Sequence, residues 1–220
     1  MVLCSHSSYV DLYKDFNVRT IHFPPCIAQE QDQSPSRSDS FEVSGRYLAF
    51  VGELNQDLDI GLLKKFAVHN PDLNLVLAGP VINREKWFLD QILELQKQPN
   101  IRMLGSVPAE SVPELIRSAD ACLMPYRSGT ESEIQNLYPQ FMHDFLKYER
   151  PVLTTFDFGL PDNERMGVKV CVSADDFLAS SGSITEISSR IDRKVVQQYL
   201  ESMTCTKKLE QLHYLMTQDN

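Results

Sequence analysis

The chain has 220 residues, of which 42% are hydrophobic and 23% charged, a globular composition that excludes global disorder. Thirty acidic residues against 21 basic ones give a formal net charge of −9, which argues against a general affinity for nucleic acid or anionic membranes, because those surfaces need clustered lysine and arginine. No apolar run reaches the roughly 18 residues of a transmembrane segment, and the first residues lack the basic and apolar regions of a secretory signal.

The first part of the chain divides into a short unit and a polar stretch. Residues 1–27 predict a strand at 2–4, a helix around Leu12 and a second strand at 18–23. About thirty residues cannot form a core alone, so this unit is expected to pack on the later part of the chain or to be the remnant of a larger domain. Residues 28–44 are rich in serine and glutamine and are predicted to form a linker.

From residue 45 to residue 220 apolar runs alternate with amphipathic stretches. The predicted strands cover residues 47–51, 73–78, 101–104, 121–124, 152–153 and 168–172. Helical spacing separates them, as at Phe88, Ile92 and Leu95, where Asn83 is the predicted N-cap, and the chain after residue 175 is predicted to be helical. This order predicts an α/β fold: a Rossmann-like, doubly wound parallel sheet with C-terminal helices.

The cysteines are five in number, widely spaced, and form no CxxC pair. This pattern predicts neither a zinc site nor a disulfide framework, and it fits a reducing cytosol, so a cytoplasmic protein is expected. Cys122 and Cys171 each lie inside an apolar run, where a free thiol behaves as a small buried hydrophobic group. The others are Cys4, Cys26 and Cys205.

Three glycines come directly after the first three strands of the regular region. Gly52, Gly79 and Gly105 lie where a parallel sheet binds its ligands, at the carboxyl ends of the strands, and glycine lets the backbone approach a ligand closely. The alternative is that each glycine only makes a tight turn. Neither G-x-G-x-x-G nor G-x-x-x-x-G-K-[ST] occurs, so the common dinucleotide and P-loop sites are not predicted.

The connection from Pro125 to Tyr138 is the most informative loop. It exceeds the usual two to six residues of a βα connection, and such length is often functional. Its Arg127 could pair with a phosphate through two hydrogen bonds, although a solvated surface loop explains the same residues equally well. The five histidines show no ligand spacing, and Trp87, the sole tryptophan, is interpreted as a packing residue. No G-x-S-x-G elbow supports a hydrolase.

Three segments, residues 50–80, 99–127 and 138–155, carry a family resemblance. They contain a glycine-ended strand, a strand ending in G-P, "PNIRMLG", "ADACLMP" and a helix closing on "PVLTT". This succession resembles the C-terminal, donor-binding half of GT-B fold glycosyltransferases, family 4 or group 1-like, which include many bacterial polysaccharide and teichuronic-acid transferases. The N-terminal unit is similar to the last β-α-β of the acceptor half, and the final helices are similar to those that return across the cleft.

The resemblance implies a site for a nucleotide-diphospho-sugar at the carboxyl edge of the sheet. It places Gly52 and Glu53 toward the donor phosphates and sugar, and Asp144 at the ribose hydroxyls. The loop with Arg127, Asn136 and Tyr138 lies near the diphosphate in this resemblance. The residues that it places around the nucleotide are Gly79, Pro80, Gly105, Ser106 and Val107. No metal and no cofactor beyond this donor substrate are implied.

Three positions and one loop depart from the pattern of the family. The first of two acidic residues eight positions apart falls on Asn136, a basic residue is replaced by Phe141, and the glycine after the helix is Glu149. The first loop, residues 53–59, is acidic where the family carries basic residues. Since cations supply much of the stabilisation of a diphosphate, these departures predict that this chain binds the donor weakly or not at all.

The sequence supports two functions from different classes. The first is a hexosyltransferase-like glycosyltransferase domain that transfers the sugar to an unknown acceptor in polysaccharide biosynthesis. A two-domain enzyme needs roughly twice this length, so the domain is expected to be incomplete or to need a partner half. The alternative is a noncatalytic GT-B-like interaction domain that docks a protein partner or a second copy of itself as a homodimer.

Overall fold

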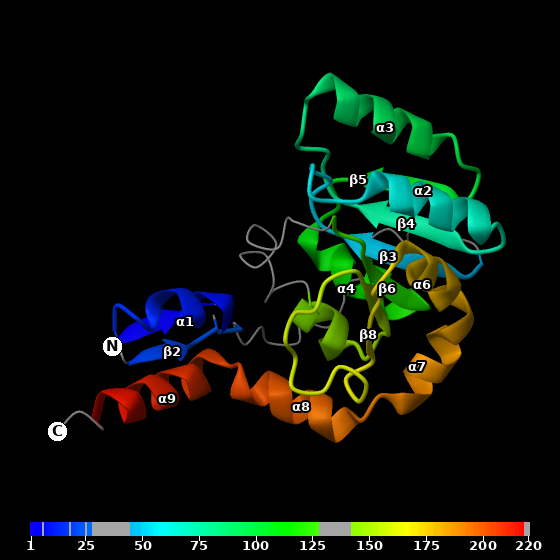
Figure 1. Ribbon diagram of the computed structural model, residues 1–220. Helices are drawn as coiled ribbons and strands as arrows, with labels where there is room; N and C mark the ends of the chain where they lie inside the picture. Colours follow the sequence, from blue (N-terminus) through cyan, green and yellow to red (C-terminus); the bar gives the residue numbers. More distant parts are fainter. Residues whose placement is uncertain (6, 18, 25, 28–44, 128–141, 218–220) are drawn as a thin grey trace.

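A six-stranded sheet forms the centre of the computed structural model, which describes residues 1–5, 7–17, 19–24, 26–27, 45–127 and 142–217 (Figure 1). The strand order is β5-β4-β3-β6-β7-β8, and every neighbouring pair is parallel. The α/β, doubly wound fold expected from the sequence is therefore confirmed. The strands are β3 (Tyr47–Val51), β4 (Asn74–Ala78), β5 (Ile101–Gly105), β6 (Ala121–Met124), β7 (Val152–Thr154) and β8 (Val168–Val170).

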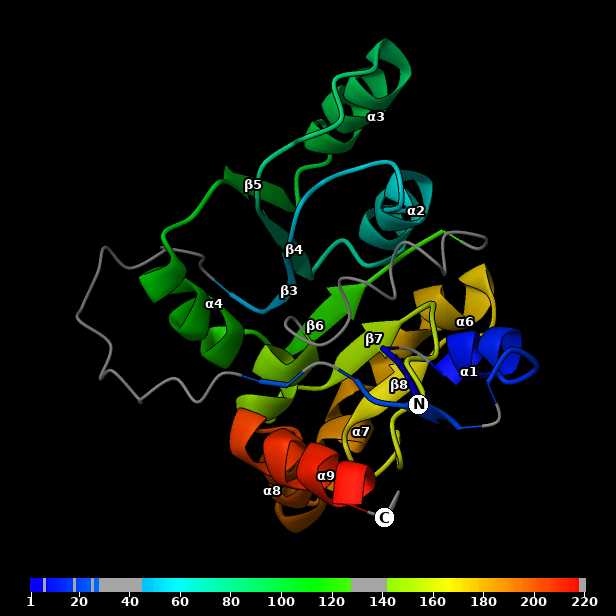
Figure 2. The ribbon, with the colours of Figure 1, turned by 90° about the vertical axis from the view of Figure 1, so that its left-hand side faces the viewer.

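Helices cover both faces of this sheet. Figure 2 shows α2 (Ile60–His69), α3 (Lys86–Gln96) and α6 (Ala174–Ala179) on one side of the strands and α4 (Val112–Ser118) on the other. All five residues of β3 are buried, because this strand lies inside the sheet and is covered on both faces. Phe66 of α2 and Phe177 of α6 meet edge to face at 5.4 Å, which joins these two helices above the core.

The cap of α3 differs from the prediction. Asn83 lies three residues before the helix, and its side-chain oxygen accepts the Glu85 N–H at 2.8 Å, while Glu85 takes the N-cap position without a side-chain cap. Asparagine competes well for such a local turn, so the helix begins later than its apolar spacing suggests. By contrast, Asp59 caps α2 by accepting the Leu62 N–H at 2.8 Å.

A tight turn ends the helical residues 142–147. The Arg150 N–H donates to the Phe145 carbonyl at 3.2 Å and the Glu149 N–H donates to the Leu146 carbonyl at 2.9 Å, which is the hydrogen-bond pattern of a Schellman motif. Glu149 has a φ of 52°, the only positive φ of a non-glycine residue among the described residues. Its carboxylate lies 2.8 Å from the Arg193 guanidinium. Glu149 therefore holds a conformation that glycine adopts more easily.

The chain leaves the sheet through α7 (Ile184–Arg190), α8 (Arg193–Ser202) and α9 (Cys205–Thr217), and α9 reaches the N-terminal unit (Figure 1). That unit consists of β1 (Val2–Cys4), α1 (Ser7–Tyr13) and β2 (Thr20–His22), whose strands form a separate two-stranded parallel sheet. The Ile27 N–H donates to the Met203 carbonyl at 2.8 Å just before α9. The unit thus packs on the C-terminal helix.

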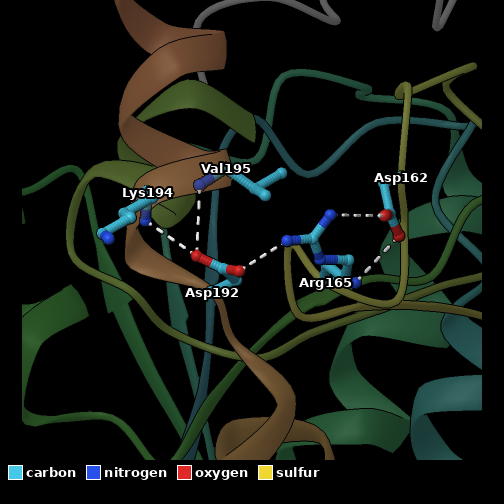
Figure 3. A network of polar contacts seen from close by, with 5 residues as sticks. All are labelled: Asp162, Arg165, Asp192, Lys194 and Val195. Carbon is cyan, nitrogen blue, oxygen red and sulfur yellow. Dashed lines mark hydrogen bonds and ion pairs between the residues drawn. The ribbon is translucent and has the colours of Figure 1, made fainter.

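A polar network fixes the start of α8 (Figure 3). One carboxylate oxygen of Asp192 accepts the Lys194 and Val195 N–H groups at 3.0 and 3.3 Å. The other accepts the Arg165 guanidinium at 2.6 Å, and Arg165 also lies 3.9 Å from the Asp162 carboxylate. The cap and the ion pair together tie the direction of α8 to the segment that precedes β8.

The cysteines differ from the prediction in one respect. Cys26 and Cys205 form a disulfide, whereas Cys4, Cys122 and Cys171 are free and buried. The expectation of buried thiols at Cys122 and Cys171 is confirmed, and burial raises the pKa of Cys171 to about 11. The cysteine spacing, which predicts no disulfide framework, gives no sign of this single pair, because the partners are 179 residues apart and meet only when α9 packs on the N-terminal unit.

Candidate functional site

The carboxyl ends of β5, β4, β3 and β6 form one continuous edge, because the four strands are neighbours and run in parallel. The Gly52 N–H donates to the Ala78 carbonyl at 2.9 Å, and the Gly79 N–H donates to the Gly105 carbonyl at 2.7 Å. The three glycines singled out in the sequence therefore lie side by side at the tips of adjacent strands. This edge is where an open parallel sheet binds its ligands.

Gly79 has a local reason for having no side chain. Its φ is +148°, and a Cβ atom there would lie 1.8 Å from the Gly52 carbonyl oxygen. Gly105 also has a positive φ of +66°, but a Cβ there would meet no atom within 4 Å. Close packing of two loops explains the glycine at 79, and a turn explains the one at 105. Gly79 is buried, whereas Gly105 is exposed and leaves accessible backbone beside the edge.

The loop after β3 is held by hydrogen bonds of the Asp57 backbone and of the Asp59 carboxylate. Asp57 is 4% exposed, and its N–H donates to the Asn55 side chain at 3.1 Å. Asp59 is the cap of α2, as described above. Glu53, in contrast, is exposed. The structure therefore puts carboxylates in this loop, where the family resemblance implies basic residues.

Arg127 lies at the end of β6 and is directed toward α3. Its N–H donates to the Asp57 carbonyl at 2.8 Å. Its guanidinium donates to the Gln91 side chain at 3.2 Å and lies 5.5 Å from the centre of the Trp87 ring. Trp87 is 44% exposed, so its interpretation as a packing residue is incomplete. No local pattern in the sequence signals these two partners, since they lie about 40 residues earlier in the chain.

A cavity of about 450 Å³ opens between α2 and α3 beside Arg127. Its walls carry three carboxylates and two cations, and Lys64 lies 3.5 Å from the Glu94 carboxylate. Of the predicted site residues that the structure describes, Arg127 lines it and the others do not. The lining residues are Asp59, Ile60, Gly61, Lys64, Asp90, Gln91, Glu94 and Arg127.

Three further predicted residues lie along the same edge. Pro80 is exposed and its carbonyl accepts the Leu54 N–H at 2.9 Å, which joins the first two loops. Ser106 is exposed, and Val107 is half-buried and packs on the core. These loops flank a shared surface in front of β4 and β5.

Asp144 is half-buried in the helical residues 142–147. These helical residues precede β7 in the chain. Next to Asp144, His143 is 2% exposed, and its Nε2 lies 3.3 Å from the Tyr199 hydroxyl of α8. Burial lowers the pKa of His143 to about 4, so this ring is neutral near pH 7. Asn136 and Tyr138 lie outside the described residues.

The described residues contain neither a metal-binding cluster nor a membrane-spanning helix. No group of three or more histidine, cysteine, aspartate or glutamate side chains there could hold a metal ion. In the same part of the chain, no helix is both long and apolar enough to cross a membrane.

The chain matches two kinds of known sequence. The family model for glycosyl transferases group 1 matches residues 33–193. The putative teichuronic acid biosynthesis glycosyltransferase TuaH of Bacillus subtilis (strain 168) is 28% identical over 134 residues. That alignment covers 61% of this chain and 32% of TuaH, so the chain spans about a third of the length of this relative.

Solved structures share the fold. The lipopolysaccharide outer core galactosyltransferase WaaB matches with a TM-score of 0.69 and 13% identity, over 99% of this chain and 62% of WaaB. Sucrose-phosphate synthase from Thermosynechococcus elongatus matches with a TM-score of 0.67 and 13% identity, over 99% of this chain and 57% of the synthase. A mutant of S. aureus TarM, in complex with fondaparinux, α-GlcNAc-glycerol and UDP, matches with a TM-score of 0.65 and 12% identity. The match covers 97% of this chain and 43% of TarM. The chain spans less than two thirds of each of these proteins.

Proposed function

Because the chain belongs to the group 1 glycosyl transferases, we propose that its sheet domain binds a nucleotide-diphospho-sugar and that sugar transfer requires a second α/β half. One observation carries the proposal: β5, β4, β3 and β6 are adjacent, so the loops named by the family resemblance share one edge. The UDP in the TarM complex, on a protein of the same fold, supports this class of ligand.

In this proposal the exposed backbone around Gly105 and Ser106 lies beside the nucleotide base, and Asp144 accepts hydrogen bonds from the ribose hydroxyls. Arg127 is the cation for the diphosphate, held by Gln91 and Trp87 before any ligand arrives. A guanidinium whose direction is already fixed loses less conformational entropy on binding. Glu53 opposes a diphosphate electrostatically, so the affinity of the isolated chain is expected to be low.

The need for a second half is supported by the N-terminal unit. A two-stranded parallel sheet is too small to be stable alone, and parallel sheets are normally covered on both faces. Here Leu3, Leu12 and Phe16 are 39%, 58% and 84% exposed. Apolar side chains that gather on so small a unit are expected to pack against further strands and helices, which we assign to an acceptor-type half.

Calorimetric titration of the chain with UDP and GDP tests the donor site. Binding at micromolar to millimolar nucleotide is expected, and Arg127→Ala should weaken it about tenfold, the effect of one charge-assisted hydrogen bond. Arg102→Ala is the matched control, because Arg102 donates to the Pro99 carbonyl at the opposite end of the sheet and should leave the affinity unchanged. Absence of binding at millimolar concentrations of both nucleotides would refute the proposal.

The alternative, a noncatalytic interaction domain, is favoured by the acidic first loop and by the exposed apolar residues of the N-terminal unit. Sedimentation velocity separates the two functions. Self-association that Phe16→Ser abolishes, together with a lack of nucleotide binding, would support the interaction domain. A monomer that binds UDP would support the transferase half.

A further inference from the structure

A disulfide joins the N-terminal unit to α9. Cys26 and Cys205 form a disulfide with a Cα–Cα distance of 4.8 Å. Next to it the Ile27 N–H donates to the Met203 carbonyl at 2.8 Å, and the Cys205 sulfur lies 3.4 Å from the Ile27 carbonyl oxygen. The bond therefore attaches the end of the N-terminal unit to the first residue of α9.

Within the described part of the chain, polar and cation–π contacts also hold this unit on α9. The Arg19 guanidinium donates to the Leu215 carbonyl, and the Lys208 ammonium lies 5.0 Å from the centre of the Phe23 ring. The large apolar side chains of Phe16 and Leu209 are 84% and 66% exposed, so they add little to the contact. When such non-covalent contacts open locally, a covalent link still holds the two segments together.

The two sulfurs have different surroundings. Cys26 is an exposed residue, whereas Cys205 is half-buried. Cys205 is the first residue of a 13-residue helix, and Lys207 and Lys208 lie within its first turn. The helix N-terminus stabilises negative charge on the sulfur of Cys205. This arrangement favours attack on Cys26 with Cys205 as the leaving group.

We propose that Cys26–Cys205 is a thiol–disulfide exchange site for low-molecular-weight thiols, and that its state decides whether the β1–α1–β2 unit is fastened to α9. A thiolate attacks the Cys26 sulfur, the bond between the protein sulfurs breaks, and Cys205 leaves as a thiolate that takes up a proton. A second thiol then displaces the first from Cys26. The products are a small disulfide and two protein thiols; the reverse sequence, with the small disulfide as oxidant, closes the bond.

Thiol counting by mass spectrometry tests the chemistry on the full chain. Protein equilibrated with oxidised glutathione and then alkylated under denaturing conditions should carry three alkyl groups, because five cysteines are present and three are free. After equilibration with excess reduced glutathione it should carry five. Five groups in the oxidised sample, or three in the reduced one, would overturn the proposal.

Hydrogen exchange tests the fastening. Reduction should speed exchange of the Ile27 and Phe23 amides by about tenfold or more, while amides of β3 stay unchanged. Cys26→Ser, at an exposed position, should exchange like the reduced protein with or without reductant. Equal exchange in the oxidised and reduced protein would show that the bond does not hold the unit. Neither test requires nucleotide binding, so both remain valid if the donor site is refuted.

Discussion

Replacing Glu149 by glycine is expected to stabilise the protein by about 1 kcal/mol relative to replacing it by alanine. Glu149 occupies the C′ position of a Schellman motif with a φ of 52°, where a side chain crowds the following carbonyl group. Glycine removes this strain. It occupies the same position in the family pattern, so the substitution restores the residue that the turn requires.

The ion pair of Glu149 must be separated from its backbone effect. Its carboxylate lies 2.8 Å from the Arg193 guanidinium, and the two side chains are 36% and 82% exposed. Such exposed pairs contribute about 0–1 kcal/mol. Glu149→Ala removes the pair and keeps the positive φ, so it should be slightly less stable than the unchanged protein. Glu149→Gly also loses the ion pair but relieves the backbone strain at the positive φ. The difference in the free energy of unfolding between the two variants therefore measures this strain.

Urea unfolding at neutral pH, followed by circular dichroism, measures this difference. A gain of about 1 kcal/mol corresponds to a rise of about 2–4 °C in the melting temperature for a chain of this length. Arg193→Ala serves as the control: in the unchanged protein it should remove the contribution of the pair without changing the turn, and in the two Glu149 variants, which lack the pair, it should have no such effect. A glycine variant no more stable than the alanine variant would refute the assignment of strain to residue 149.

Three other substitutions have defined outcomes. Gly79→Ala should lower the free energy of unfolding by several kcal/mol, because its Cβ would lie 1.8 Å from the Gly52 carbonyl oxygen; a loss below about 1 kcal/mol in urea would contradict this packing. Burial lowers the pKa of His143 to about 4 from 6.5, so the unfolded chain binds the proton more tightly. Stability is complete above about pH 6.5 and falls by up to about 3 kcal/mol as the pH drops toward 4, and His143→Gln should remove this dependence; an unchanged slope would exclude the histidine as its cause. The Arg165 guanidinium beside Asp192 holds the pKa of that carboxyl below its usual range, so its contribution is present above about pH 4 and is lost in stronger acid. Asp192→Asn should therefore destabilise the protein at neutral pH and have no effect near pH 2, and a variant equally stable at both pH values would rule this out.

Much of the sheet domain can be predicted from the sequence because its signals are local. Uniformly apolar runs such as residues 47–51 and 121–124 become the buried central strands, and Gly52 and Pro125 mark the ends of these two strands. The start of α3 escapes prediction because Asn83 satisfies a nearby N–H instead of capping the helix. The disulfide of Cys26 escapes it because its partner is brought close by packing of distant elements.

The candidate site is only partly predictable for the same reason. The positions of Gly52 and Gly79 depend on strand order, and the structure brings them together. The direction of Arg127 depends on Gln91 and Trp87, which belong to a helix on another part of the sheet. A positive φ at Glu149 cannot be read from a glutamate, although the family pattern marks that position as a glycine.

Because α9 lies against the N-terminal unit, the first and last described elements of the chain form one module away from the sheet (Figure 1). Truncation at the carboxyl end therefore acts on the amino end: removing α9 deletes the acceptor of Arg19, the lysine over Phe23 and the disulfide partner of Cys26. A chain cut at residue 204 would keep its sheet and lose the anchorage of its opening strands. A protein fused before β1 or after α9 would likewise be attached to this same module.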